Sequence, residues 1–380
     1  MSLVLGEDQQ ILKQSAADFV KRESPVSRIR QLRDSRDADG FSRALWARMA
    51  ALGWQGIVIP EQYGGMGMGY LEMACVLEEC GRNLVPEPLL STVLLGANAI
   101  LLGGTEEQRA GLLPNVADGS LLLALAYQER TSRYDVHSVG TRATRQGDGY
   151  VISGQKTLVI DGHIADKLVV SARTGAGGSD ADGISLFLVA PDAPGVEVVR
   201  QQTMHLRNSA LVRLTEVEVP AAALLGAEGK AGPVLDDVID RATVGLCAEM
   251  LGSSQAAFDM TLDYLKTRKQ FGVVIGTFQA LKHRAATMFV ELELARSSVL
   301  GACDAIDSGS EKWKEAVSAA KARCSDMATL VGNEGIQMHG GIGMTDEHDI
   351  GFYAKRARGS ELTFGDAAYH RDRFASLQGF

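Results

Sequence analysis

Apolar residues recur at helical spacing through the first third of the chain. Two such faces consist of Ile11, Leu12, Ala16, Phe19 and Val20, and of Leu45, Trp46, Met49 and Leu52. Residues 70–80 and 88–102 predict two more apolar helices, and a capping box at Thr105–Gln108 predicts the start of another. The pattern predicts an N-terminal α-helical domain over residues 1–120.

The apolar spacing becomes strand-like from about Leu121. Short runs rich in leucine or β-branched residues are separated by turn signals such as Gly147–Gly149. The runs are Leu121–Tyr127, Gly140–Arg145, Tyr150–Ile152, Lys167–Ala172, Ile184–Val189, Val196–Arg200 and Ala210–Val219. Short strands at this spacing predict a middle antiparallel β-barrel or sandwich domain over residues 121–228.

Helical spacing returns from about Gly232 and continues until near the end of the chain. Three long periodic segments, Val234–Thr267, Phe278–Ile306 and Lys312–Met338, predict a C-terminal helical bundle over residues 229–380. Their apolar content is high for the surface of a monomer, so we expect burial against other subunits. The expected fold class is α+β multidomain, with helical, β and helical domains in that order.

The composition is that of an ordinary globular protein of 380 residues, with 46% hydrophobic and 22% charged residues. A net charge of −9 without a basic block makes nucleic acid and anionic membranes poor candidate partners. The five cysteines are odd in number and lack C-x-x-C spacing, which favours reduced thiols over disulfides or zinc. No signal-peptide pattern and no bilayer-length apolar run occur, so we expect a cytoplasmic protein without membrane insertion.

Candidate chemistry concentrates in Tyr264–Met288, where two glycines interrupt the helical spacing. Arg268 supplies a planar cation suited to phosphate oxygens, and Phe271 supplies a flat surface on which a ring can stack. Gln279 adds an amide that can both donate and accept hydrogen bonds. These residues suit a phosphate-linked aromatic cofactor, and a helix–turn–helix with a solvated arginine is the alternative.

Other candidate sites are weaker. Gly64–Gly69 lacks the G-x-G-x-x-G spacing and a surrounding βαβ unit, so a turn is favoured over a phosphate loop. A helix start with solvated charges explains the acidic run Asp346–Asp349 better than a metal site does. Nucleophile-elbow, P-loop and H-E-x-x-H motifs are absent, and we predict no metal site.

Two motifs together carry a family resemblance. Arg268–Gln279 resembles the R-x-x-F-G … F-Q signature of the acyl-CoA dehydrogenase family of flavoproteins, and QMHGGIG at Gln337–Gly343 resembles its Q-x-x-G-G turn. The order and separation of the motifs agree with that family, and the resemblance covers essentially the whole chain. It implies the family architecture of helical, β and helical-bundle domains.

The resemblance also implies FAD as the cofactor. It places Arg268 and Phe271 at the FAD pyrophosphate and adenine side, with Gln279 as another FAD contact. The motif residues Gln337, Gly340 and Gly341 would reach the FAD of a neighbouring subunit, because bare backbone lets N–H groups approach phosphate closely. A homo- or hetero-oligomer, dimer or tetramer, would follow.

The chemistry implied is removal of two hydrogens across Cα–Cβ of an acyl-CoA thioester, giving the 2-enoyl-CoA. A carboxylate accepts the α-proton while the β-hydrogen leaves as hydride to the flavin. An electron-acceptor flavoprotein would then be a further partner.

The resemblance fails where the proton acceptor should stand. The family's Glu-Gly-Thr aligns with Phe364–Asp366, and the position that some relatives use instead falls near Ala242. Neither phenylalanine nor alanine accepts a proton. The weak substitutes nearby are Asp366, Glu249 and Asp240.

The middle domain also departs from the family pattern. Tyr127–Asp135 replaces the T-E-P-G-x-G-S-D loop over the flavin, and Lys156–Asp161 replaces K-x-W-I-T-N. Gln128 keeps a polar group able to reach the flavin ring, whereas Leu158 and Ile160 replace the tryptophan and threonine. Two alternatives therefore stay open: a catalytically silent FAD-binding subunit of a hetero-oligomer, and a flavin oxygenase or scaffold of the same fold.

Overall fold

The computed structural model describes residues 4–175 and 181–380. The chain divides into two compact units, each built from segments that are distant in sequence. The first unit contains Met1–Asp34, Gly69–Val85 and Thr243–Phe380, and the second contains Ser35–Met68 and Pro86–Ala242. The sequence-based boundaries at residues 120 and 228 are drawn on a different basis and stay predictions.

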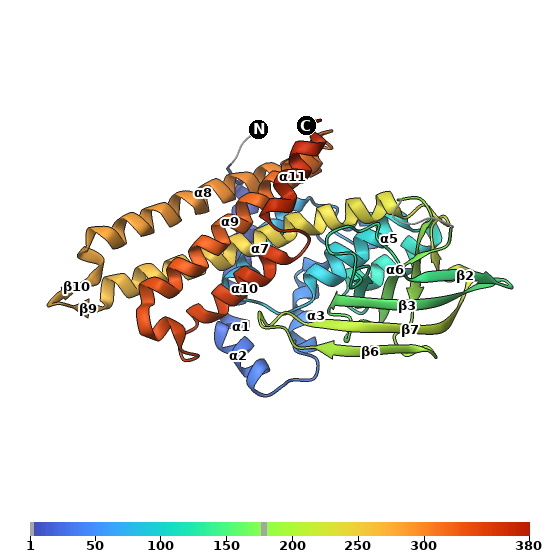
Figure 1. Cartoon of the computed structure of the whole chain (residues 1–380), viewed down its shortest axis with the longest axis horizontal. Coiled ribbons are helices and arrows are strands. Elements are labelled where there is room, and N and C mark those ends of the chain that lie inside the picture. The colour runs from blue at the N-terminus through green and yellow to red at the C-terminus, as the bar shows by residue number, and fades with distance from the viewer. Residues whose placement is uncertain (1–3, 176–180) are drawn as a thin grey trace. The chain divides into compact units, whose positions relative to one another are not determined.

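The first unit is helical (Figure 1). Its elements are α1 (Glu7–Glu23), α2 (Val26–Asp34), α4 (Tyr70–Arg82), most of α7 (Gly232–Thr267), β9 (Lys269–Gln270), β10 (Val273–Val274), η5 (Ile275–Thr277), α8 (Gln279–Asp307), α9 (Trp313–His339), η6 (Gly340–Met344), α10 (Ile350–Leu362) and α11 (Ala367–Leu377). Helix α9 packs against α8, α10 and α11. Gly332 and Gly335 let α10 approach closely, since a Cβ on Gly335 would lie 2.9 Å from the Ile350 side chain.

The second unit combines short helices with a sheet. Its helical elements are α3 (Arg43–Ala51), η1 (Trp54–Gly56), η2 (Glu61–Tyr63), the π-helix η3 (Leu89–Ala97), α5 (Asn98–Gly103), α6 (Glu106–Ala117) and η4 (Ala221–Ala223). Its strands are β1 (Leu123–Ala126), β2 (Arg142–Gln146), β3 (Gly149–Ile160), β4 (Lys167–Arg173), β5 (Ile184–Val189), β6 (Val196–Gln201), β7 (Ser209–Pro220) and β8 (Leu224–Leu225).

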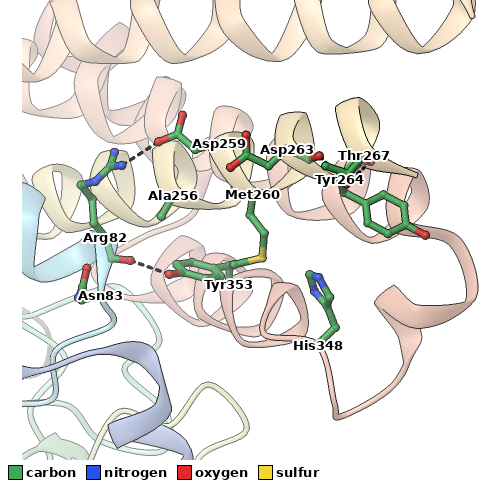
Figure 2. Close-up of a pocket in the computed structure, with 10 residues that line it drawn as sticks. All are labelled: Arg82, Asn83, Ala256, Asp259, Met260, Asp263, Tyr264, Thr267, His348 and Tyr353. Atoms are coloured by element: carbon green, nitrogen blue, oxygen red, sulfur yellow. Dashed lines mark hydrogen bonds and ion pairs between the residues drawn. The ribbon is translucent and has the colours of Figure 1, made fainter. Parts of the chain in front are cut away.

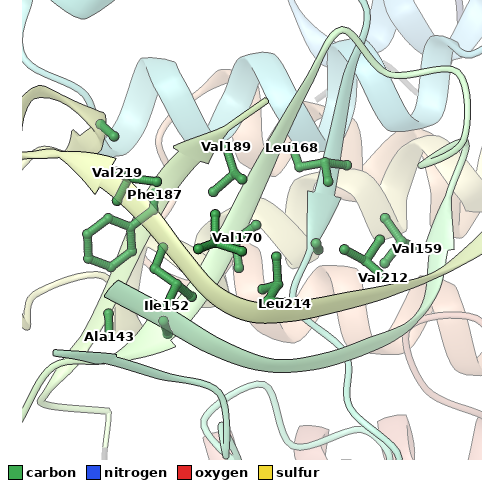
Figure 3. Packing of buried hydrophobic residues seen from close by; sticks show 14 of the residues in the cluster. Ala143, Ile152, Val159, Leu168, Val170, Phe187, Val189, Val212, Leu214 and Val219 are labelled. Carbon is green, nitrogen blue, oxygen red and sulfur yellow. The ribbon is translucent and has the colours of Figure 1, made fainter. Parts of the chain in front are cut away.

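The strands form one mixed sheet in the order β6-β7-β3-β2-β4-β5-β8, with β1 paired to β4. Most neighbours are antiparallel, but β1 and β2 each run parallel to β4. Alternate inward residues such as Ile152, Val170 and Val212 build its buried core (Figure 3). Phe187 meets Tyr150 edge-on in this core, with ring centroids 5.0 Å apart.

Helical, β and helical regions follow one another along the chain, which confirms the predicted fold class. Helices α7, α8 and α9 begin and end within two residues of the predicted segments. The sequence predicted only the start of β3, because polar residues in the middle of the strand hide its apolar pattern. The pairing of β3 with β7 also has two register shifts, at Ile152–Gly154 and Lys156–Val159. The acidic run at Asp346–Asp349 precedes a helix, as predicted, because Asp349 is the N-cap of α10 and Asp346 is exposed. The ion pairs of these two carboxylates with Arg30 and Arg33 of α2 were not predicted.

All five cysteines are free thiols, as predicted. Within residues 4–175 and 181–380, no three His, Cys, Asp or Glu side chains gather as metal ligands. In the same residues, no helix has the length and apolar character needed to cross a membrane.

Candidate functional site

A β-hairpin joins α7 to α8 and carries the first cofactor motif (Figure 1). Phe271 and Gly272 form its two-residue turn, with φ of 54° and 79°. Positive φ at both turn positions is the type I′ geometry, which suits the twist of a hairpin. A positive φ is unfavourable for phenylalanine. Phe271 is also 91% exposed, so its ring is not buried in the core. The structure therefore presents the Phe271 ring outward, and its edge-on contact with Phe278 has ring centroids 6.2 Å apart.

Arg268 lies between α7 and the hairpin. Its carbonyl accepts a hydrogen bond from Ile275 N at 2.9 Å, which closes the connector. Its guanidinium is exposed and bonds to no group in the described part of the chain. Gln279, the first residue of α8, is exposed as well. The three residues predicted to hold a cofactor therefore share one connector, with side chains open to a ligand.

The second motif ends α9. Gln337 lies exposed in the last turn of the helix, and Gly340 ends it with φ of 63°. A Cβ on Gly340 or Gly341 would meet nothing within 4 Å. Glycine is required at Gly340 for its backbone conformation, and the backbone of both residues is open to an approaching group.

Aromatic rings connect the two motifs. The Tyr264 ring on α7 lies 4.6 Å from that of His339, which in turn lies 4.4 Å from His348. His339 Nδ1 is 2.7 Å from the Gly335 carbonyl, so this nitrogen carries the proton. Burial lowers the pKa of His339 and keeps the ring neutral. Both motifs consequently belong to the same end of the helical unit.

A pocket of about 560 Å³ lies beside these rings, between α7, α10 and the end of α4 (Figure 2). Its lining consists of Arg82, Asn83, Ala256, Asp259, Met260, Asp263, Tyr264, Thr267, His348 and Tyr353. The Arg82 guanidinium donates to Asp259 at 2.7 Å, and Tyr353 Oη donates to the Arg82 carbonyl at 2.6 Å. Arg82 is thus already neutralised, so the pocket offers no spare arginine to a phosphate.

Sequence reasoning did not find this pocket. Its α7 residues recur every three or four positions and share one helical face, and that polar face was the available signal. The partners from α4 and α10 are far away in sequence and could not be read from spacing.

The two positions where a proton acceptor was expected are buried and apolar. Phe364 is 7% exposed with φ of 62°, and Ala242 is fully buried. Asp366 begins α11 as its N-cap and accepts from Tyr369 N at 2.9 Å. Both other candidates lie on α7: Asp240 is 3% exposed, and Glu249 is half-buried.

Two buried bases fix the turn that holds Phe364. Lys321 donates to the carbonyls of Glu361 and Gly365, at 2.8 and 2.7 Å. His370 Nε2 lies 3.1 Å from the Phe364 carbonyl. Burial lowers the pKa of Lys321 to about 8, and burial together with nearby Lys321 lowers that of His370 to about 3. The turn is therefore tied to α9 and α11 through its backbone.

Gln128 lies in the second unit, just after β1. Its carbonyl accepts from Thr157 N at 2.8 Å, and its side-chain amide donates to the Arg133 carbonyl at 3.3 Å. Leu158 follows on the β3 irregularity, 49% exposed and with φ of 51°. An exposed leucine in this strained conformation is an outlier of the kind found at ligand sites.

Comparisons with known proteins cover nearly all of the chain. Family models for the acyl-CoA dehydrogenase N-terminal, middle and C-terminal domains match residues 6–120, 124–217 and 234–377. A probable acyl-CoA dehydrogenase of Bacillus subtilis, YngJ, is 34% identical over 377 residues, 98% of each chain.

Two solved structures extend the comparison. Butyryl-CoA dehydrogenase from Megasphaera elsdenii shares 27% identity with a TM-score of 0.91, over 100% of each chain. The ChsE4-ChsE5 complex from Mycobacterium tuberculosis shares 26% identity with a TM-score of 0.88, again over 100% of each chain. The chain therefore belongs to the acyl-CoA dehydrogenase family of flavoprotein oxidoreductases, whose reaction is the FAD-dependent dehydrogenation of acyl-CoA.

Proposed function

We propose that this chain binds FAD and takes part in the α,β-dehydrogenation of an acyl-CoA to the 2-enoyl-CoA. One observation carries the proposal: Arg268, in the R-x-x-F-G motif, presents a guanidinium without a partner in the described part of the chain, next to the exposed ring of Phe271. A free planar cation and an open aromatic surface fit a pyrophosphate joined to an adenine.

The chain's own groups divide the work around the cofactor. In the first unit, Arg268 and Gln279 would hold the pyrophosphate side of the cofactor and Phe271 its adenine. Gln128, in the second unit, would hydrogen-bond a flavin ring. When bound, FAD supplies the acceptor for the hydride that leaves the β-carbon. The protein orients the thioester and excludes water from the reacting carbons.

An oligomer completes the site in this proposal. Gln337, Gly340 and Gly341 are exposed and would reach the cofactor of a neighbouring subunit. Large apolar side chains stand open around them, including Met344 at 79% exposure, and also on α8, where Phe289 and Val290 are each 52% exposed. Clusters of exposed apolar residues are typical of protein–protein interfaces. An electron-acceptor flavoprotein is the expected redox partner.

A second candidate function has specific support. A phenylalanine and an alanine occupy both expected positions of the proton acceptor, and both are buried. The ChsE4-ChsE5 structure is a complex of two differently named chains. The chain could accordingly be the subunit of a hetero-oligomer that binds FAD while an unlike chain supplies the base. If it acts alone, Asp366, Glu249 or Asp240 must accept the α-proton.

The test is anaerobic titration of the purified flavoprotein with acyl-CoA thioesters of differing chain length and branching. Bleaching of the flavin by the chain alone supports a complete enzyme with one of the three carboxylates as base. Bleaching only after addition of an unlike family member supports the second candidate. A protein that takes up no FAD on reconstitution would contradict both.

A further inference from the structure

Lys156 of β3 carries an ammonium that is fully buried inside the second unit. It donates to Glu129 Oε1 at 2.7 Å, to Ser171 Oγ at 2.9 Å and to the Tyr127 carbonyl at 3.3 Å. An ammonium has three N–H groups, so these acceptors satisfy it completely.

The carboxylate oxygens of Glu129 likewise all accept hydrogen bonds. Besides Lys156, its carboxylate accepts from Gly140 N at 2.8 Å, from Thr141 N at 2.9 Å and from Thr141 Oγ1 at 2.7 Å. Burial alone would raise the pKa of Glu129, but Lys156 and Thr141 outweigh it and lower the pKa. Burial lowers the pKa of Lys156 to about 8, against the attraction of Glu129. Both groups are therefore charged at neutral pH.

The contacts of this ion pair flank one residue, Gln128. Lys156 binds the carbonyl of Tyr127 before it and the carboxylate of Glu129 after it. Thr157, next to Lys156 in β3, binds the carbonyl of Gln128 itself. Three consecutive residues are thus tied to β3, while the Gln128 side chain stays partly exposed.

Stability alone does not explain such a pair. A buried ion pair can often be replaced by apolar groups of similar volume without loss of stability, because desolvation offsets its attraction. What apolar groups cannot reproduce is the set of directed bonds to Tyr127, Gly140 and Thr141. These bonds tie the start of the loop Tyr127–Asp135 to Lys156 of β3 and to Gly140 and Thr141, which follow the loop in sequence.

We propose that Lys156 and Glu129 are positioning residues that hold Gln128 and the loop Tyr127–Asp135 in place to contact the flavin ring. The inference rests on the proposed function, because Gln128 is a flavin contact only there. It adds two residues that touch neither substrate nor cofactor and act through the backbone of Gln128.

Trypsin tests the loop without any cofactor. Arg130 and Arg133 are exposed within the loop, so cleavage after them reports its opening. The variant Lys156→Met/Glu129→Gln removes both charges and leaves no unpaired buried ion, which favours folding. We expect the apoprotein of this variant to be cut there at least about tenfold faster than wild type.

Lys321→Met is the matched control. Lys321 is also fully buried, and its pKa is also lowered to about 8. Its ammonium donates to the Ser325 hydroxyl and to the backbone carbonyls of Glu361 and Gly365. It belongs to the first unit and has no bond to the loop. Its loss should leave cleavage at Arg130 and Arg133 at the wild-type rate.

The visible absorption spectrum of bound FAD supplies the second readout. We expect Lys156→Met/Glu129→Gln to shift the flavin bands in the same direction as Gln128→Ala, and to weaken FAD binding by about tenfold or less. Adding Gln128→Ala to the double variant should then change the spectrum little further.

The outcomes distinguish failure of the positioning role of Lys156 and Glu129 from failure of the flavin contact of Gln128. If Gln128→Ala shifts the spectrum but the double variant matches wild type in spectrum and cleavage, the positioning role is overturned. If Gln128→Ala leaves the spectrum unchanged, the flavin contact of the proposed function fails instead. Cleavage of the apoprotein then decides the loop-ordering role: faster cutting supports it, and an unchanged rate overturns it.

Discussion

The ring of Tyr264, near the end of α7, lies 4.6 Å from that of His339, the residue just before Gly340. This contact couples the helix that leads to Arg268 with the helix end that carries the glycine turn. The two motifs are far apart in sequence, yet this pair of rings brings them to the same end of the helical unit.

The first prediction concerns Arg268. Arg268→Ala should give a folded protein with little or no bound FAD, because the charge-assisted bonds to pyrophosphate, each worth roughly 1.5–3 kcal/mol, are lost. Lys269→Ala is the control, since Lys269 is the adjacent exposed cation. Absorbance of bound flavin per chain checks the result. Full flavin retention by Arg268→Ala would remove this residue from the site.

The second prediction links cofactor and assembly. If Gln337–Gly341 contacts the FAD of a neighbouring subunit, stripping FAD should lower the melting temperature and weaken the oligomer. Size-exclusion chromatography over a dilution series compares apo and holo forms. Identical elution and dissociation of the two forms would count against a site shared between subunits.

The third prediction concerns acid stability. The pKa of buried His370 lies at about 3, below its ordinary value near 6.5. The unfolded chain therefore binds this proton first, and the contribution of neutral His370 is complete above about pH 6.5 and is lost as pH falls toward 3. Wild type should lose on the order of 2 kcal/mol from this group between about pH 6.5 and 4.5.

Chemical denaturation at the two pH values checks this loss. His370→Gln, which cannot take up the proton, should lose correspondingly less. His283→Gln changes an exposed histidine and should follow wild type. Equal losses of stability in His370→Gln and wild type would show that another group causes the loss of stability in acid.

The fourth prediction concerns Phe364. If this position faces the thioester α-carbon, Phe364→Glu restores a proton acceptor whose pKa is raised by the apolar surroundings. General base catalysis contributes typically about 10²–10⁴-fold, so the flavin should bleach faster with an acyl-CoA that binds. Stopped-flow absorbance measures the rate, and Phe364→Gln separates proton acceptance from the change in shape.

A slower reaction in Phe364→Glu than in wild type would have another meaning. Another carboxylate would then be the base, and Asp366 is the first to replace. Because Asp366 caps α11, its substitution should be read together with a melting curve.

The sequence predicted most of the fold because apolar spacing is local information. Helices α7, α8 and α9 and most strands lie where the period indicates them. The predicted β3 was too short because Lys156 occupies a buried position, and its countercharge Glu129 is distant in sequence. The helix start at Asp346–Asp349 could be predicted, but the ion pairs of Asp346 and Asp349 could not, because their partners Arg30 and Arg33 come from α2.

The candidate site, too, could be predicted only where its residues are close in sequence. Arg268, Phe271 and Gln279 could be proposed together because one connector carries them. The polar pocket could not, since α4, α7 and α10 all contribute to it and Arg82 finds Asp259 only in the folded chain. The base candidates Asp366, Glu249 and Asp240 stay predictions, because nearness in sequence does not fix the direction of a carboxylate.

The most direct measurement follows the thioester and the flavin in one anaerobic reaction. The FAD-loaded protein is mixed with acyl-CoA, alone and together with an unlike family member, and the thioester is analysed by mass spectrometry while the flavin absorbance is recorded. The account predicts that the flavin bleaches and that an equal amount of thioester loses two hydrogens, giving the 2-enoyl-CoA. A flavin that stays oxidised with every acyl-CoA under both conditions, with the thioester unchanged, would contradict it.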